Sequence, residues 1–295
     1  MTIVDPYRAG VWLAREDPEP EVVVVGVPNS KSSSTRADLA PLEMRNRLDR
    51  FSTYHSELEA DLGSVRVRDM GNWPISGYDP ESLVEELPRW TAKLSDAPLR
   101  IFLGGDNAIT RPLVAARATD LTGLITFDAH QDVGTLEDGP SNSNPVRGLI
   151  EEDGLGGHNI VRIGIHSFFN PVSDHRFCDD AGVTTVTVAQ VEDSGIKATV
   201  DAGLDRLSSS CDQIYVNVDV GVLDSAFAPA CPGARPGGLT VRQLATGVAR
   251  CAAHPTVSAV GFVGVDPGAD TGHQTVDVLA HLFLSTVAGY ARRGV

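Results

Sequence analysis

The sequence predicts an α/β domain built on a mostly parallel sheet. The chain has 295 residues, of which 42% are hydrophobic, enough for one domain with a sizeable core. Short apolar runs alternate with helical patterns about eight times, as parallel β-α units do. No linker or break in composition interrupts the alternation. We therefore expect one domain over residues 1–295, with the Pro- and charge-rich residues 1–20 on its surface.

The first half of the chain supplies four expected strands. Residues 22–25 are consecutive valines, typical of a strand covered on both faces, and residues 65–70 alternate. The paired glycines 104 and 105 allow a tight turn after the third strand. The expected strands are residues 21–27, 65–70, 99–103 and 121–127. The expected helices are roughly residues 41–51, 80–87 and 108–118.

The second half repeats the pattern with four more apolar runs. The expected strands are residues 160–165, 183–188, 213–219 and 257–265. The expected helices are residues 145–152, 197–207, 240–252 and 276–291. Residues 174–180 hold Asp, His and Cys in a polar connection, and we interpret them as a solvated loop.

Composition and charge narrow the class of ligand. The formal net charge is −15, which argues against nucleic acid and anionic membranes, both of which attract basic surfaces. The four cysteines form no CxxC pair, as expected of reduced thiols in the cytoplasm. The N-terminus lacks the apolar segment of a signal peptide, and no run approaches the roughly 18 apolar residues of a membrane span. We expect a cytoplasmic protein that acts on a small molecule.

An acidic segment follows the strand at residues 121–127. Asp128, His130 and Asp132 alternate, so they share one face if the strand stays extended. Two carboxylates with an imidazole suit Mn, Ni, Fe or Zn better than Ca. The alternative is a set of ordinary polar residues that face water at the end of a strand.

A second acidic strand ends at Asp219. In α/β sheets ligands bind beyond the carboxyl ends of the strands, so Asp106, Asp128 and Asp219 are expected to meet there. Carboxylates a few ångströms apart repel by several kcal/mol at an effective dielectric of about 20. A metal ion, a shared proton or a basic side chain must neutralise them.

Four blocks occur in an order that names a family. They are Gly104-Gly105-Asp106, residues 128–132, residues 219–229 and residues 233–240. Together they resemble the ureohydrolase superfamily of arginase, agmatinase, guanidinobutyrase and formimidoylglutamase, over roughly residues 21–291. The resemblance implies a three-layer α/β/α domain with an eight-stranded parallel sheet, and trimers or hexamers. It also implies two Mn ions whose bridging hydroxide attacks a guanidinium or amidine carbon.

The chain departs from the family pattern at four functional positions. A metal-ligating His is replaced by Asn107, and the second Asp of the DxD block by Gly221. The His of the catalytic loop aligns with Asn142, and the Glu that grips the guanidinium aligns with Gly264. By this alignment each metal loses one of four ligands. We expect one divalent ion (Mn, Ni or Zn) or none, rather than the full two-metal cluster.

These considerations define the candidate site. The candidate catalytic residues are Asp128, Asp219, His130 and Asn142. The candidate metal ligands are Asp128, His130, Asp132, Asp219 and, through a weak carbonyl, Asn107. The candidate substrate-binding residues are Asn144, Gly264, Asp266 and His273, the last also a candidate proton shuttle. Arg235, in the Pro- and Gly-rich loop after the second acidic strand, is a weaker candidate.

Two functions follow from this site. The first is a ureohydrolase-like hydrolase that cleaves a C–N bond of an amidine or modified guanidine. The alternative is a catalytically inactive homologue that serves as a partner subunit, scaffold or ligand sensor. We expect a homo-oligomer, or a heteromer with an active homologue. Nucleotide binding is disfavoured because the sequence has neither GxGxxG nor a P-loop.

Overall fold

The fold is organised around one eight-stranded sheet. The computed structural model describes residues 5–94, 96–117 and 121–294. The strand order is β4-β1-β5-β10-β9-β6-β7-β8, and all neighbours pair in parallel. The strands are β1 Val22–Val27, β4 Val67–Asn72, β5 Leu99–Gly104, β6 Thr122–Phe127, β7 Ile160–Ile165, β8 Thr184–Thr187, β9 Gln213–Asp219 and β10 Val257–Val263. A separate two-stranded hairpin joins β2 Tyr54–His55 to β3 Ala60–Asp61.

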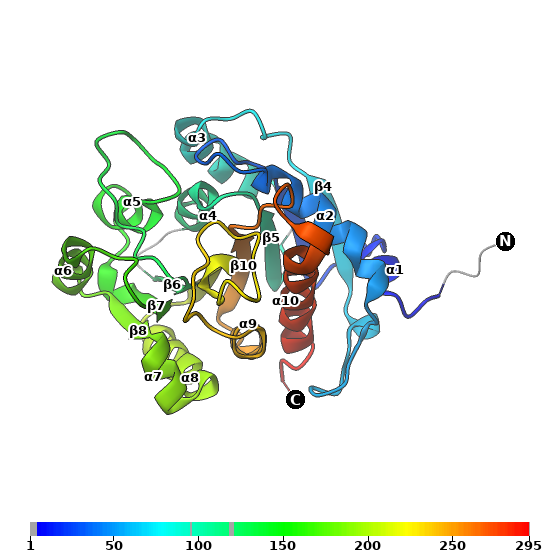
Figure 1. Ribbon diagram of the computed structural model, residues 1–295. Helices are drawn as coiled ribbons and strands as arrows, with labels where there is room; N and C mark the ends of the chain where they lie inside the picture. The colour runs from blue at the N-terminus through cyan, green and yellow to red at the C-terminus, as the bar shows by residue number, and fades with distance from the viewer. Residues whose placement is uncertain (1–4, 95, 118–120, 295) are drawn as a thin grey trace.

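Helices cover both faces of this sheet, which confirms the expected three-layer α/β/α architecture (Figure 1). On one face lie α1 Ala9–Leu13, α2 Ala40–Arg47, α7 Val188–Ser194, α8 Ile196–Ser208, α9 Val241–Ala253 and α10 Gln274–Tyr290. On the other face lie α3 Pro80–Thr91, α4 Thr110–Ala115, α5 Pro145–Glu151 and α6 Val172–Ala181. None of the helices in the described ranges is long and apolar enough to cross a membrane.

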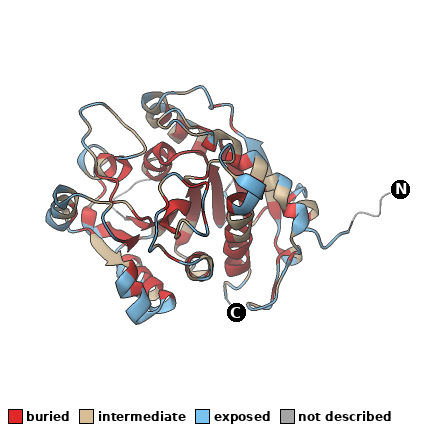
Figure 2. Cartoon of the chain, viewed as in Figure 1, coloured by how far each residue is buried: buried red, intermediate tan, exposed pale blue. Residues whose placement is uncertain are grey.

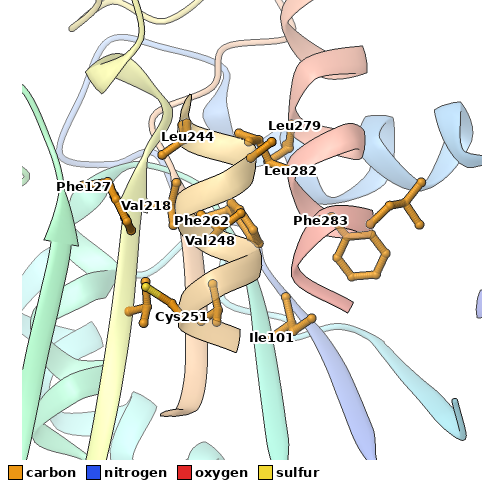
Figure 3. Close-up of a cluster of buried hydrophobic side chains, with 14 of the residues drawn as sticks. Ile101, Phe127, Val218, Leu244, Val248, Cys251, Phe262, Leu279, Leu282 and Phe283 are labelled. Atoms are coloured by element: carbon orange, nitrogen blue, oxygen red, sulfur yellow. The ribbon is translucent and has the colours of Figure 1, made fainter. Parts of the chain in front are cut away.

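The core forms because each central strand is apolar on both sides (Figure 2). In β1, Val22 and Val24 pack into one hydrophobic cluster, and Val23 and Val25 pack into the other. On α9, Leu244, Val248 and Cys251 recur at helical spacing and face the sheet beside α10 (Figure 3).

Two segments differ from the sequence expectation. Residues 174–180 belong to helix α6 rather than a solvated loop. Only Cys178 of that helix is buried, so its apolar signal was too weak to see, while Gly182 in a left-handed conformation ends it. Residues 1–20 were expected on the surface, but Trp12 of α1 is fully buried and its indole donates a hydrogen bond to the backbone oxygen of Val65.

Candidate active site at the carboxyl ends of the central strands

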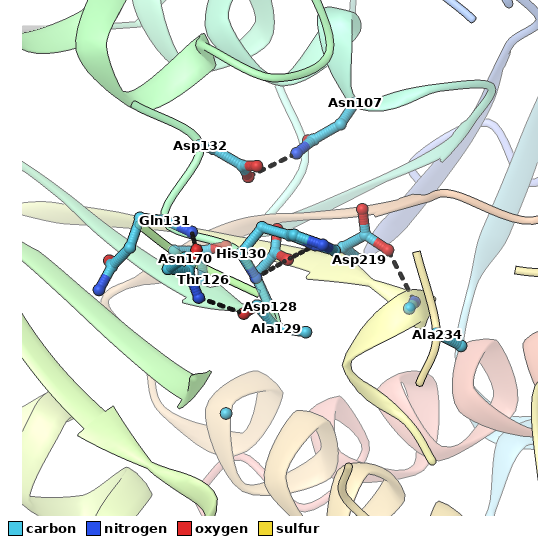
Figure 4. A network of polar contacts seen from close by, with 12 residues as sticks. Asn107, Thr126, Asp128, Ala129, His130, Gln131, Asp132, Asn170, Asp219 and Ala234 are labelled. Carbon is cyan, nitrogen blue, oxygen red and sulfur yellow. Dashed lines mark hydrogen bonds and ion pairs between the residues drawn. The ribbon is translucent and has the colours of Figure 1, made fainter. Parts of the chain in front are cut away.

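The strand order places the predicted acidic residues at one edge of the sheet. Strands β5, β10, β9 and β6 are consecutive neighbours. Strand β5 ends two residues before Asp106, and β10 ends just before Gly264. Strand β9 ends at Asp219, and β6 ends just before Asp128. Figure 4 shows side chains from β9 and from the segments after β5 and β6 gathered in this region. Residues far apart in the sequence therefore lie together beyond the carboxyl ends of these strands, where ligands bind in open α/β sheets.

The backbone turns immediately after β6 instead of remaining extended. The strand ends at Phe127, and Asp128 accepts a hydrogen bond from the backbone N–H of His130 at 2.8 Å. Asp132 has a left-handed φ of 51°. The strand does not stay extended, so the condition under which Asp128, His130 and Asp132 would share one strand face is not met. Asn170 fixes the turn through two hydrogen bonds to its backbone.

Protein groups surround Asp132 on one side of the cluster. The amide nitrogen of Asn107 lies 2.8 Å from an Asp132 carboxylate oxygen. The Asn107 carbonyl oxygen instead accepts from the Thr110 hydroxyl at 2.6 Å and from the Asn217 amide at 3.3 Å. The guanidinium of Arg162 lies 3.7 Å from the same Asp132 oxygen. As arranged, Asn107 presents a donor to the cluster and its oxygen faces elsewhere.

Glycines surround Asp219 on the other side. The Asp219 carboxylate accepts a hydrogen bond from the backbone N–H of Gly221 at 2.7 Å. A Cβ atom at Gly221 would lie 2.8 Å from this carboxylate, and a Cβ at Gly264 only 2.5 Å from it. Gly264 also has a φ of 86°, which side chains rarely adopt. A side chain at position 264 would therefore need both a rare backbone conformation and a shift of the Asp219 carboxylate.

The pKa values of the three carboxyl groups shift in different directions: those of Asp132 and Asp219 rise, and that of Asp128 falls. Burial, followed by the charge of Asp128, raises the pKa of Asp132 well above its usual value and the pKa of Asp219 to about 7. Burial also opposes ionisation of Asp128, but hydrogen bonds from His130 and Asp132 and the charge of Arg162 lower the pKa of Asp128 overall. A hydrogen bond to Asp128 raises the pKa of His130. These shifts favour the protonated forms of Asp132 and Asp219, and the Arg162 guanidinium adds a positive charge beside Asp132.

The carboxylates offer one oxygen that lacks a protein partner. The second oxygen of Asp128 is buried and, within the described ranges, accepts no hydrogen bond. The His130 ring nitrogen lies 3.5 Å from the other Asp128 oxygen, with about a third of the His130 side chain exposed. As these residues are arranged, no three described His, Cys, Asp or Glu side chains converge closely enough to hold a metal ion. Asp128, Asp219 and His130 would have to adjust to share one.

Asn142 and Asn144 lie in the loop after β6. Asn142 contacts the loop that follows β1: its backbone N–H donates to the Ser32 hydroxyl at 2.6 Å, and that hydroxyl lies 3.2 Å from the Asn142 side-chain oxygen. Asn144 is buried, donates to the backbone oxygens of Thr135 and Gly139, and accepts from the backbone N–H of Ser141. Asn144 thus holds its own loop together.

The remaining predicted substrate-binding residues contact neighbouring backbone or solvent. Asp266 accepts hydrogen bonds from the backbone N–H groups of Arg36 at 3.1 Å and Gly268 at 2.9 Å. His273 is exposed at the start of α10. The predicted metal ligands therefore lie in one region at the edge of the sheet, whereas Asp266 binds backbone N–H groups and His273 faces solvent.

Sequence reasoning missed two residues of the site and underrated a third. Arg162 is fully buried in β7, and Phe169 packs edge-on against the His130 ring at 5.7 Å. Arg235, a weak candidate from the sequence, places its guanidinium 5.7 Å from the Phe169 ring centre. The available signal was an arginine inside the apolar run 160–165. Phe169 carried none, because its contact depends on how the loop after β7 folds back.

The fold and the gathered acidic residues define an arginase-like α/β protein. The model of the arginase family matches residues 20–289, and the chain belongs to this family. It is 35% identical over 274 residues to the formimidoylglutamase of Halalkalibacterium halodurans, covering 90% of this chain and 86% of that protein.

Solved structures agree with this assignment. The crystal structure of formimidoylglutamase from Bacillus subtilis superposes with a TM-score of 0.90 at 30% identity, covering 100% of this chain and 96% of that one. Trypanosoma cruzi formiminoglutamase, solved with Mn2+2, shares the fold with a TM-score of 0.84 at 21% identity, covering 97% and 99% of the two chains.

Proposed function

We propose that this protein hydrolyses the C–N bond of a formimidoyl amidine carried by a small carboxylic acid. The observation that carries the proposal is the backbone at Gly264, which offers no carboxylate and where the left-handed φ and the nearby Asp219 carboxylate disfavour an anionic side chain. A free guanidinium would lack its carboxylate partner there. The similarity to two named formimidoylglutamases, at 35% and 34% identity, favours the smaller amidine group.

The reaction balances with water alone. The water oxygen bonds to the amidine carbon, the bond from that carbon to the carrier nitrogen breaks, and the products are an amine and formamide. Asp128, His130 and Asp219 are the donors best placed to hold a divalent ion at the cavity. Such an ion, when bound, lowers the pKa of a coordinated water.

A family-type pair of ions does not fit this donor set. The Asn107 oxygen is bonded to Thr110 and Asn217, and Gly221 has no side chain. Asp132 already faces the Asn107 amide and Arg162. We propose one ion at most, consistent with the expectation from the sequence.

The Arg235 guanidinium, close to His130 through Phe169, is a candidate partner for the carboxylate of the substrate. Arg235 is exposed, and its guanidinium stacks near Phe169, which contacts His130. A substrate with its amidine at Asp128 could place a carboxylate against this guanidinium. We also propose that the protein forms a homo-oligomer, as the family resemblance implies.

The test is a substrate screen with purified full-length protein loaded with Mn, Ni or Zn. N-formimidoylglutamate, agmatine and arginine are compared by release of glutamate with formamide, or of urea. We expect turnover of the formimidoyl compound and negligible urea. Asp128→Asn should lower kcat/KM at least roughly 1000-fold, because it removes a central carboxylate. Faster urea release than formamide release would overturn the proposal.

The alternative is an inactive homologue that binds a ligand without turnover. It is favoured by the position of Asn142, whose amide contacts Ser32 where the family resemblance implies a catalytic His. It predicts no product from any of the three compounds with any of the three metals. Product formation that Asp128→Asn abolishes would exclude it.

A further inference from the structure

Arg162 is a buried charge on β7, the strand that lies between β6 and the edge strand β8. It lies on β7 with 0% of its side chain exposed. In the sheet register it pairs with Thr126 of β6, which pairs in turn with Asn217 of β9. Thr126 and Asn217 are themselves buried. A polar row therefore crosses three strands beneath Asp132.

The guanidinium of Arg162 is only partly satisfied by neutral groups. One terminal nitrogen donates to the backbone oxygen of His130 and lies 3.7 Å from Asp132. Its Nε and Nη1 atoms are buried and, in the part of the chain that the structure describes, find no hydrogen-bond partner. A buried charge in this state is strongly unfavourable unless an opposite charge compensates it. The carboxylates of the cluster, Asp132 foremost, supply that charge.

We infer that Arg162 is a permanent cation of this cluster. Together with Asn107 it satisfies Asp132 and takes the place of a divalent ion on that side, so the chain binds at most one such ion, at Asp128, His130 and Asp219. The guanidinium is held at this place because Arg162 belongs to a strand of the sheet. A divalent ion beside Asp132 would lie within a few ångströms of it and be repelled.

The first test is the number of bound ions. Metal content per chain is measured by plasma mass spectrometry after loading with Mn²⁺ and desalting. We expect no more than one ion in the unaltered protein. The double variant Asn107→His/Arg162→Met removes the guanidinium, adds an imidazole ligand and should bind one ion more. Two ions in the unaltered protein, or no increase in the double variant, would overturn the inference.

The second test is thermal unfolding in EDTA, which needs neither metal nor substrate. Arg162→Met leaves Asp132 buried without its neighbouring cation, although the Asn107 amide still donates to it, so the Tm should fall by roughly 5–10 °C. Adding Asp132→Asn removes the stranded charge and should restore much of the loss. If Arg162→Met alone does not fold, recovery of folded protein in the Asp132→Asn/Arg162→Met variant is the readout. Failure of Asp132→Asn to restore folding or Tm contradicts the pairing.

Arg111 provides the matched control. It is also a buried arginine, but it pairs with Asp153 at 2.7 Å and Glu152 at 2.6 Å. Arg111→Met should lower the Tm without any rescue by Asp132→Asn and without a change in metal content. Both readouts are independent of the proposed hydrolysis: a protein without turnover can still show the Arg162–Asp132 coupling, and an active one can lack it.

Discussion

The two sides of the acid cluster solve the same electrostatic problem differently. Asp132 is enclosed by the Asn107 amide and the Arg162 guanidinium. Asp219 receives a backbone N–H from Gly221 and lies against Gly264. The Asp132 carboxylate faces two side chains of the protein, whereas the Asp219 carboxylate accepts its hydrogen bond from a backbone N–H. The protein therefore places a cationic side chain against Asp132 and only a neutral backbone donor against Asp219.

The largest effect that would separate Asp219 from Asp132 is expected in the pH dependence of the free energy of unfolding. Its pKa is raised to about 7, mainly by burial and then by Asp128, so the folded state binds a proton that the unfolded chain has already released. Stability should therefore fall as pH rises from about 4 to 7. Asp219→Asn removes this loss and should stabilise the metal-free protein by roughly 2–4 kcal/mol at pH 8, and little at pH 4.

Urea unfolding in EDTA at the two pH values measures this effect. Asp277 is the control, because its hydrogen bond to Arg47 lowers its pKa. That group adds stability above the pKa of the unfolded chain, and the contribution is lost as pH falls. Asp277→Asn should thus destabilise at pH 8, the opposite sign. A destabilising Asp219→Asn at pH 8 would show that Asp219 is charged and well paired.

A smaller effect is expected at Gly264. Gly264→Ala combines a positive φ with a Cβ only 2.5 Å from the Asp219 carboxylate, and should cost about 2–3 kcal/mol of unfolding free energy. Gly272 has a φ of 74° but, among the described atoms, nothing within 4 Å of its would-be Cβ. Gly272→Ala should cost only about 1 kcal/mol. Chemical denaturation of both variants compares them, and equal losses would mean that Asp219 yields freely.

The sheet was predictable because its strands are apolar on both faces. The expected bounds 160–165 and 213–219 match β7 and β9, since apolar residues make up most of both runs. The short helix α1 and the polar helix α6 were missed because each has too few apolar positions to show a period.

The site was predictable only where topology alone determines it. Asp128 and Asp219 meet because both follow neighbouring strands, which a general rule about parallel sheets anticipates. The partners of those acids were not accessible in the same way. Whether Arg162 faces Asp132 depends on the register between β6 and β7 and on a turn with a left-handed residue, both of which are tertiary outcomes.

The smallest expected effect separates loop support from substrate contact at Asn144. Its three hydrogen bonds to the backbone of residues 135, 139 and 141 connect the loop after β6 to the start of α5. Asn144→Ala should therefore cost about 1–2 kcal/mol of stability, with KM within roughly twofold of the unaltered protein. Asn144→Asp keeps the acceptor but turns a carboxylate toward two carbonyl oxygens, so it should destabilise at least as much. Steady-state kinetics and unfolding curves of both variants decide between the two roles. A raised KM with unchanged stability would return Asn144 to the substrate-binding role that the sequence predicts.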